Sequence, residues 1–381
     1  MRMRTAFLLL ACLAVPFPAR AAKPPYLNAA DFPSIQAAID ALGKQGGTVM
    51  IPPGVYDAAT VPAYVPPLLL PSRTPVRLVG AGRDVTVLRS KDASADLCRL
   101  QAGFQSVEQL TFEGPGARGR GNGAVVGTAA GDKAVLSHVE LRDVIVRRAA
   151  HHGIYVKGRG SDNDSLAILC TYDGVIVDSP ESSAVWIDGR CTTQFFRDCS
   201  FWNFKGYGAL VRGAGHQFSN CDFEQSPDGP ASLEFVFLDG CSGADLRNCW
   251  FEDQRSNTKP PYFVRTRAIA THVNIDQCTF ARKHAAAVRG ILVEPWMHSL
   301  TISNPLFTAR DVSGAPFEAR DQITLRGYSG NLTDDKRISV TLVGGVAATT
   351  RAYYPVVATD SLLSGERAQP GMLLVQPQTG R

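Results

Sequence analysis

The sequence predicts an all-β protein, a right-handed parallel β-helix with an N-terminal capping helix and C-terminal capping strands. Three observations support this prediction. A hexapeptide recurs at intervals of 22 to 34 residues, a second series of short strands follows it, and an amphipathic helical segment precedes both. Repeats with a period in this range are typical of solenoids.

The first 21 residues have the pattern of a secretory signal peptide. Arg2 and Arg4 precede an apolar run at 7–15, and Ala19 and Ala21 form an A-x-A cleavage site. We therefore expect a secreted or periplasmic protein in which 22–320 form the β-helix domain and 321–381 form capping strands and a tail. No later segment is long and apolar enough to predict a membrane span.

The charge of the mature chain argues against nucleic acid as a partner. The whole chain carries a formal charge of +4, and the leader contains Arg2, Arg4 and Arg20. Removing them leaves about +1, too little for the broad basic surface that nucleic acid binding requires.

The hexapeptide sets the geometry of the coil. Its first, fourth and sixth residues are mainly apolar, and we expect them to face inward. Its third residue is mostly Asn, Asp or Gly, the types that best tolerate left-handed backbone, so a sharp bend is expected there. The third positions are Gln109, Asp143, Gly174, Asp198, Asn220, Asn248, Gln277 and Asn304. Asn and Asp stacked at one corner can hydrogen-bond from coil to coil.

Short alternating strands follow each hexapeptide after a loop. They lie at 153–157, 184–188, 208–212, 235–239, 263–267 and 290–294. Strict alternation gives each strand one inward and one outward face. Residues 31–42 read as an amphipathic helix that covers the first coil. Residues 338–343, 353–357 and 372–375 are plausible capping strands.

Four cysteines share the fourth hexapeptide position. They are Cys199, Cys221, Cys249 and Cys278, and Pro305 takes the same place in the last repeat. Such neighbours lie near disulfide range. We nevertheless expect buried free thiols, because cysteine is a small core residue that suits a repeating inward position.

Residues 32–42, 47–56 and 77–88, together with the repeats, resemble the pectate-lyase superfamily, specifically its rhamnogalacturonase/epimerase-like branch. The resemblance implies a right-handed β-helix and a substrate cleft on the sheet of the second strand series. The family includes lyases, hydrolases, epimerases and non-catalytic members. Its galacturonan hydrolases carry Asn-Thr-Asp and Arg-Ile-Lys motifs that this sequence lacks, so hydrolysis is the least favoured activity.

Outward residues of the second strands provide candidate substrate contacts. Tyr155, Trp186 and Phe237 fall in one column and could form an aromatic platform for sugar rings. Alternatively, loops could fold over them and bury them.

A second outward column alternates in charge. It reads Lys157, Asp188, Arg212, Asp239, Arg267 and Glu294. Alternation avoids repulsion between neighbouring strands, so a structural ladder that needs no substrate explains it well. The functional alternative makes His152 or Asp188 a catalytic base, with Lys157 and Arg212 stabilising the charge of a uronate.

The loop before Tyr155 contains Arg147, Arg148, His151 and His152, which could bind an anionic sugar or could be an ordinary solvated loop. Residues 161–165 could bind calcium but more often such a segment is a turn. We otherwise expect no metal or cofactor.

The sequence thus predicts a carbohydrate-active β-helix that binds and modifies an acidic polysaccharide by elimination or epimerisation. A non-catalytic glycan-binding or surface-binding protein and a glycoside hydrolase are the alternatives. The oligomeric state is left open.

Overall fold

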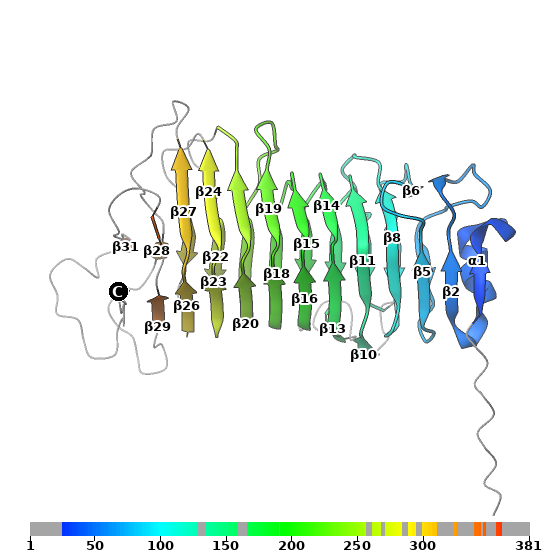
Figure 1. Ribbon diagram of the computed structural model, residues 1–381, viewed down its shortest axis with the longest axis horizontal. Helices are drawn as coiled ribbons and strands as arrows, with labels where there is room; N and C mark the ends of the chain where they lie inside the picture. The colour runs from blue at the N-terminus through cyan, green and yellow to red at the C-terminus, as the bar shows by residue number, and fades with distance from the viewer. Residues whose placement is uncertain are drawn as a thin grey trace, which may run out of the picture.

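The computed structural model shows a single column of stacked parallel strands (Figure 1). It describes residues 25–128, 135–158, 166–189, 191–256, 261–267, 271–283, 289–294 and 299–310, and strands at 323–326, 339–343, 346–347 and 356–359. Each coil contributes strands to three faces, here called sheets A, B and C, and every strand pairs with its counterparts in the adjacent coils. The predicted parallel β-helix is confirmed.

Sheet A holds the predicted second-strand series. Its strands are β4 (Leu68–Leu70), β7 (Cys98–Leu100), β9 (Ala124–Val126), β12 (Ile154–Val156), β15 (Val185–Ile187), the first parts of β18 (Ala209–Ser219) and β20 (Val236–Arg247), β22 (Val264–Arg267), β25 (Ile291–Val293), β28 (Ile323–Arg326) and β31 (Val356–Thr359).

Sheet B follows sheet A along each coil. Its strands are β1 (Tyr26–Asn28), β2 (Gly47–Met50), β5 (Val76–Val79), the first parts of β8 (Ser106–Glu113) and β11 (Glu140–Arg147), β10 (Val135–Ser137), β13 (Leu166–Asp173), β16 (Thr192–Arg197), the second parts of β18 and β20, β23 (Val273–Asp276), β26 (Ser299–Ser303) and β29 (Ser339–Val343).

Sheet C completes the coil. Its strands are β3 (Gly54–Tyr56), β6 (Thr86–Arg89), the second parts of β8 and β11, β14 (Ile176–Asp178), β17 (Ser200–Trp202), β19 (Asp222–Gln225), β21 (Trp250–Asp253), β24 (Thr279–Lys283), β27 (Leu306–Arg310) and β30 (Val346–Ala347).

The corner between sheets B and C is the predicted left-handed position. All eight third residues of the hexapeptides have φ between 49° and 61°, including Gln109 and Gln277, whose side chains depart from the pattern. Asn220 Nδ2 donates to Asp198 Oδ1 at 3.0 Å, and Asn248 Nδ2 donates to Asn220 Oδ1 at 2.9 Å. The corner therefore combines backbone preference with hydrogen bonds between coils.

The interior is a set of stacked side chains. Phe201, Phe223, Phe251, Phe280 and Phe307 occupy the sixth hexapeptide position, with successive ring centroids 4.8 to 5.0 Å apart. The fourth-position cysteines are buried and free, as predicted, and so are the other four described cysteines. The Cys199 thiol donates to the Tyr172 carbonyl at 3.2 Å, so its weak donor is satisfied inside the coil.

The N-terminal helix is shorter than predicted. A 3₁₀ turn, η1 (Ala29–Asp31), precedes α1 (Ile35–Ala41), and a second 3₁₀ turn, η2 (Gly43–Gln45), follows it. Ser34 caps the N-terminus of α1, because its hydroxyl accepts the Ala37 N–H at 3.0 Å. The Gln36 amide bonds both backbone groups of Leu69 at 2.9 and 3.1 Å, so it takes the place of a strand partner for β4.

The C-terminal strands extend the coils. β28 pairs with β25, β29 with β26, β30 with β27 and β31 with β28, all in parallel. Two of the three predicted capping segments thus overlap strands that continue sheets A and B, while 372–375 lies outside the described residues. Residues 1–21, the predicted leader, also lie outside them.

Candidate functional site

The aromatic column of sheet A is partly open. Tyr155 pairs with Trp186, and Trp186 pairs with Leu210 on the next coil. The strands alternate as expected, so Tyr155 and Trp186 point outward and both are half-buried. Leu210 points the same way but is only 2 % exposed. Two of the three predicted platform residues therefore meet the surface.

Phe237 is the third predicted platform residue, and its ring is covered. It is 2 % exposed although its strand position points outward. Tyr207 stacks on it with centroids 5.3 Å apart, and the guanidinium carbons of Arg265 and Arg267 lie 5.0 and 4.9 Å from the ring centre. These long side chains cover the face that a sugar would need. Alternation along the strand predicted the direction of Phe237 but not its cover.

The charged column is connected by ion pairs. Arg212 Nη1 lies 3.0 Å from Asp188 Oδ1, and Arg212 Nε and Nη2 lie 3.0 and 2.9 Å from Asp239 Oδ2. Arg267 reaches the other oxygen of Asp239 at 3.0 Å. One coil further, Arg265 bonds both carboxylate oxygens of Glu294. The expected ladder is therefore connected by ion pairs from β15 to β22, and Glu294, after β25, is held by Arg265 of the aromatic column.

Pairing sets the protonation of the ladder. Burial raises the pKa of Asp239, but hydrogen bonds from Arg267 and Arg212 outweigh it and the pKa falls below its usual range. Burial likewise works to lower the pKa of Arg212, and the bonds to Asp239 and Asp188 raise it above the usual value. Both groups stay charged across the physiological pH range.

Asp188 also joins the ladder to the aromatic column. The Tyr155 hydroxyl donates to Asp188 Oδ2 at 3.4 Å, while Oδ1 faces Arg212. Lys157 Nζ lies 5.8 Å from the centre of the Tyr155 ring, and the Arg212 guanidinium carbon lies 5.9 Å from that of Trp186. A carboxylate, a phenol, an indole and two cations thus meet at the surface of three adjacent coils.

His152, a predicted base, lies beneath this surface. It is 5 % exposed, and its ring centroid is 4.6 Å from Trp186 and 3.8 Å from His151. Burial, with a smaller effect of His151, lowers the pKa of His152 to about 3. Its Nδ1 accepts the Ser183 N–H at 3.4 Å. A neutral, buried imidazole of such low basicity is a poor proton acceptor, and its contact with Trp186 makes it a support for that ring.

The predicted cluster of Arg147, Arg148, His151 and His152 is divided in the structure. Arg147 and Arg148 both pair with Glu113, which is 2 % exposed on sheet C. His151 Nδ1 instead lies 3.3 Å from Asn122 Oδ1, and burial lowers the His151 pKa. The chain turns from sheet C toward sheet A between Arg148 and His151. The two arginines therefore lie at sheet C and the two histidines next to sheet A.

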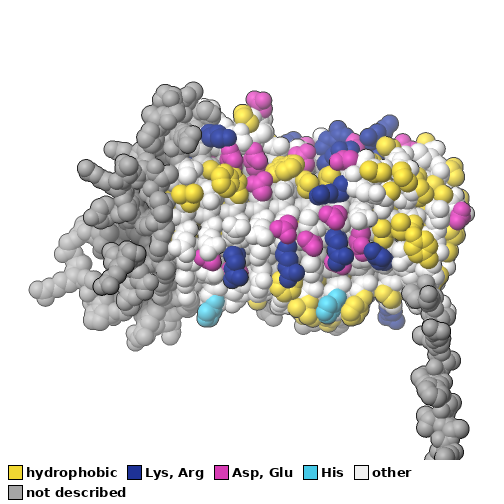
Figure 2. Space-filling model, in the orientation of Figure 1, with side chains coloured by type: hydrophobic (Ala, Val, Ile, Leu, Met, Phe, Trp, Pro, Cys, Tyr) yellow, Lys and Arg dark blue, Asp and Glu magenta, His cyan; other side chains and the backbone are white. Residues whose placement is uncertain are grey.

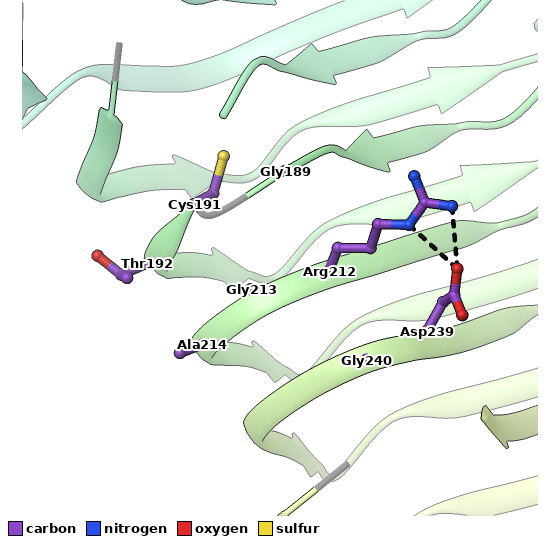
Figure 3. Close-up of a pocket in the computed structure, with 8 residues that line it drawn as sticks. All are labelled: Gly189, Cys191, Thr192, Arg212, Gly213, Ala214, Asp239 and Gly240. Carbon is purple, nitrogen blue, oxygen red and sulfur yellow. Dashed lines mark hydrogen bonds and ion pairs between the residues drawn. The ribbon is translucent and has the colours of Figure 1, made fainter. Parts of the chain in front are cut away.

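An open hollow of about 480 Å³ lies beside the charge ladder (Figure 3). Gly189, Gly213 and Gly240 line it with Arg212 and Asp239. The three glycines have φ of 62°, 97° and 68°, so each provides the bend that leaves sheet A. Sequence reasoning missed this hollow, although the signal was present: each glycine directly follows a ladder residue.

In the part of the chain that the structure describes, no three His, Cys, Asp or Glu side chains form a group that could hold a metal ion. No helix there is long and apolar enough to cross a bilayer. The calcium-binding candidate at 161–165 lies outside the described residues.

Solved structures with the same arrangement identify the fold. The A-module of mannuronan C-5 epimerase AlgE6 from Azotobacter vinelandii superposes with a TM-score of 0.55 at 17% identity, covering 87% of this chain and 97% of that one. The AlgE4 A-module from the same organism gives 0.53 at 18% identity, covering 88% and 100%. The fold is a right-handed parallel β-helix. ORF18 of Geobacillus virus E2 shares this β-helix with a TM-score of 0.50 at 16% identity, covering 85% of this chain and 62% of that one. No family profile matches the chain, and no curated protein sequence matches it.

Proposed function

We propose that the protein binds an acidic polysaccharide across sheet A and modifies it by elimination or epimerisation. One observation carries the proposal. Asp188 lies between two cations of the neighbouring coils, Lys157 and Arg212, beside the half-exposed rings of Tyr155 and Trp186. This is the set of groups that proton abstraction next to a uronate carboxylate requires.

The proposed reaction begins with transfer of the proton on the carbon next to the uronate carboxyl to Asp188. The electron pair left on that carbon moves into the carboxylate, and Lys157 and Arg212 stabilise the added negative charge. In elimination, the bond from the neighbouring carbon to the glycosidic oxygen then breaks and that oxygen takes a proton from water. In epimerisation, water supplies a proton to the same carbon from the opposite face. In both, Asp188 afterwards releases its proton to the solvent.

Arg212 is well placed to hold the carboxylate. A guanidinium has five N–H donors, and the bonds to Asp188 and Asp239 use three of them. The same bonds fix its plane, so little side-chain entropy would be lost when the remaining donors meet a ligand. The glycine-lined hollow next to Arg212 leaves room for a sugar ring.

Two further findings support this function without deciding it. The neighbours AlgE6 and AlgE4 are described as mannuronan C-5 epimerases. Fold alone does not fix activity, so their chemistry reaches this chain only as an analogy. The signal-peptide pattern of residues 1–21 supports export, which would bring the protein to extracellular or periplasmic glycans.

A non-catalytic glycan-binding role is the second candidate. The observation that favours it is that Arg212 already pairs with both Asp188 and Asp239, so the proposed base and the proposed carboxylate-binding cation are engaged with one another within the ladder. In that case the face would bind an acidic chain but leave its stereochemistry and length unchanged.

Exchange with deuterated water separates the two candidates. Purified protein would be incubated in D₂O with polymannuronate, polyguluronate or polygalacturonate, and the polymer examined by proton NMR. Epimerisation replaces the proton next to the carboxyl group, so it should place deuterium at that carbon, whereas elimination removes that proton and leaves unsaturated ends. Asp188→Asn should abolish either product.

Binding that yields neither deuterium at that carbon nor unsaturated ends would reject the enzymatic proposal and leave the glycan-binding role. The matched control is Asp276→Asn, an exposed-face carboxylate of sheet B that lies away from this site. It should give the same products as the unchanged protein.

A further inference from the structure

Sheet C carries a different charge pattern from sheet A. Its outward residues follow one column along the solenoid, because neighbouring strands pair in register. From the N-terminal end this column reads Arg89, Glu113, Arg147, Asp178, Trp202, Glu224 and Glu252. Apart from the buried Glu113, the cations lie on the first coils, and the anions follow from Asp178 onward.

The first part of the column is basic. Arg89, Arg147 and Arg148 all pair with the single buried carboxylate of Glu113. Their side chains remain 43 %, 31 % and 51 % exposed. Three guanidiniums around one carboxylate leave an excess of about two positive charges, which Asp84, 3.2 Å from Arg147, reduces at the edge.

The later part of the column is acidic. Asp222, Glu224 and Glu252 occupy adjacent positions of β19 and β21. Their hydrogen-bond donors are largely neutral: Trp202 Nε1 donates to Asp222 at 2.9 Å, Gln254 to Glu224 at 2.5 Å and Trp250 Nε1 to Glu252 at 3.0 Å. Lys283, paired with Glu252, is the one cation that these contacts include. About two negative charges therefore remain uncompensated.

Figure 2 shows the two parts in the upper half of the visible face. Lys and Arg side chains gather toward the N-terminal end, and Asp and Glu side chains gather with hydrophobic ones nearer the middle of the solenoid. Trp250, on β21 beside these carboxylates, is 44 % exposed although large aromatic side chains are usually covered. An exposed indole among carboxylates suits a partner that brings guanidinium groups.

We propose that sheet C is an interface between two copies of this chain, with the basic part of each copy against the acidic part of the other. A two-fold axis in the plane of the interface, parallel to the strands and between β14 and β17, brings the two sheets face to face and reverses the order of the coils. It places β11 opposite β19 of the second copy and β8 opposite β21. Such an interface is isologous: both copies use the same patch, so each contact between a basic part and an acidic part occurs twice.

The geometry favours this occupant over a generic charged ligand. The strands β8 and β21 are five spacings apart, about 24 Å, so the two charged parts lie further apart than a small ligand extends. A second copy supplies both complementary parts at the same separation. The contact is narrow and polar, so we expect weak, salt-sensitive association in the micromolar range.

Sedimentation equilibrium of the mature chain tests the association. At about 50 µM protein and low ionic strength a dimer is expected, and raising the salt to about 0.5 M should shift the protein to monomer, because exposed charges are then screened. A monomer at every salt concentration would overturn the proposal. A dimer that ignores salt would also overturn it, because another surface would have to hold that dimer.

Charge reversal locates the interface. Arg148→Glu and Glu224→Lys should each weaken the dimer at least tenfold, because each places like charges opposite one another. An equimolar mixture of the two variants should recover dimer, since the carboxylate introduced in one copy then faces the ammonium introduced in the other only in the mixed pair. Arg142→Glu, on sheet B of the same coil as Arg148, is the matched control and should dimerise normally.

Each outcome of the charge-reversal experiment either supports or contradicts the two-fold contact. Recovery in the mixture supports the two-fold contact through sheet C. Single variants that dimerise like the unchanged protein, or a mixture that stays monomeric while both variants keep the far-ultraviolet circular dichroism of the unchanged protein, would contradict it.

Discussion

Sheets A and C are built from the same coils but distribute charge in opposite ways. On sheet A the sign alternates from coil to coil, so that Asp188, Arg212 and Asp239 neutralise one another within about one strand spacing. On sheet C the signs are separated along the solenoid, with Arg147 and Arg148 several coils from Glu224 and Glu252. Alternation produces a rigid, locally neutral surface, whereas separation leaves a field that extends into solvent.

The comparison shows what each face is suited to do. A locally neutral ladder can present fixed donors and acceptors to a ligand without strong long-range attraction. A face with separated charges can orient a large partner before contact. Both faces are stacks of parallel strands from the same coils, so the difference arises only from which residues the coils place in register.

Removing one carboxylate from each face should give the largest contrast. Asp239→Ala leaves Arg212 and Arg267 facing one another beside a carboxylate site that is 10 % exposed, so we expect a loss of roughly 2 kcal/mol in the free energy of unfolding after allowance for solvent screening. Glu224→Ala removes one of three neighbouring carboxylates and should change stability by less than about 0.5 kcal/mol. Urea denaturation would measure both. Equal losses would show that the charge patterns of the two faces do not differ in energy.

At the corner between sheets B and C, we expect a substitution to change stability more through its backbone preference than through the side-chain hydrogen bond it removes. Asn248→Ala places at φ 51° a residue that tolerates left-handed backbone less well than asparagine and removes the bond to Asn220, so a loss of about 1–2 kcal/mol is expected. Asn248→Gly removes the same bond but keeps the left-handed preference, and should lose less. Thermal unfolding would compare them. If glycine costs as much as alanine, the hydrogen bonds between coils dominate.

The acidic part of sheet C should give the smallest and most pH-dependent effect. Burial, opposed by the Trp202 bond and assisted by Glu224 and Glu252, raises the pKa of Asp222 to about 6 from 3.8. A carboxyl with a raised pKa binds its proton more tightly when folded, so its contribution to stability falls as the pH rises between these values. Asp222→Asn should therefore raise the melting temperature at pH 7.5 and have little effect near pH 4. An advantage that grows toward low pH would contradict the raised pKa.

The coil could be predicted from the sequence because each coil repeats the same local requirements. The apolar positions, the left-handed third residue and the inward cysteines each follow from one or two neighbours in the chain. Gln109 and Gln277 adopt the same bend as Asn220, which shows that stacking on adjacent coils imposes the conformation even where the residue type does not favour it.

The candidate site was harder to predict because it depends on contacts between coils. The covering of Phe237 comes from Tyr207 and from arginines one coil further on, and the burial of His152 comes from Trp186. The alternation of inward and outward residues within one strand predicts neither the covering of Phe237 nor the burial of His152. The hollow beside Arg212 was readable in principle, because a glycine follows each ladder residue, but only the pairing of the strands shows that these glycines are adjacent.

Calorimetric titration with uronans tests the central claim, that the outer face of sheet A binds an acidic polysaccharide, most directly. Polymannuronate, polyguluronate and polygalacturonate would each be titrated into the protein, with dextran as the neutral control. We expect at least one uronan to bind and dextran not to bind. Lys157→Ala and Trp186→Ala should each weaken that binding by about tenfold, the loss expected for one charge-assisted hydrogen bond or one stacked ring, and Lys157→Ala should do so without lowering the melting temperature appreciably. If no uronan binds, or if both variants bind as tightly as the unchanged protein, the sheet A face is not the glycan site.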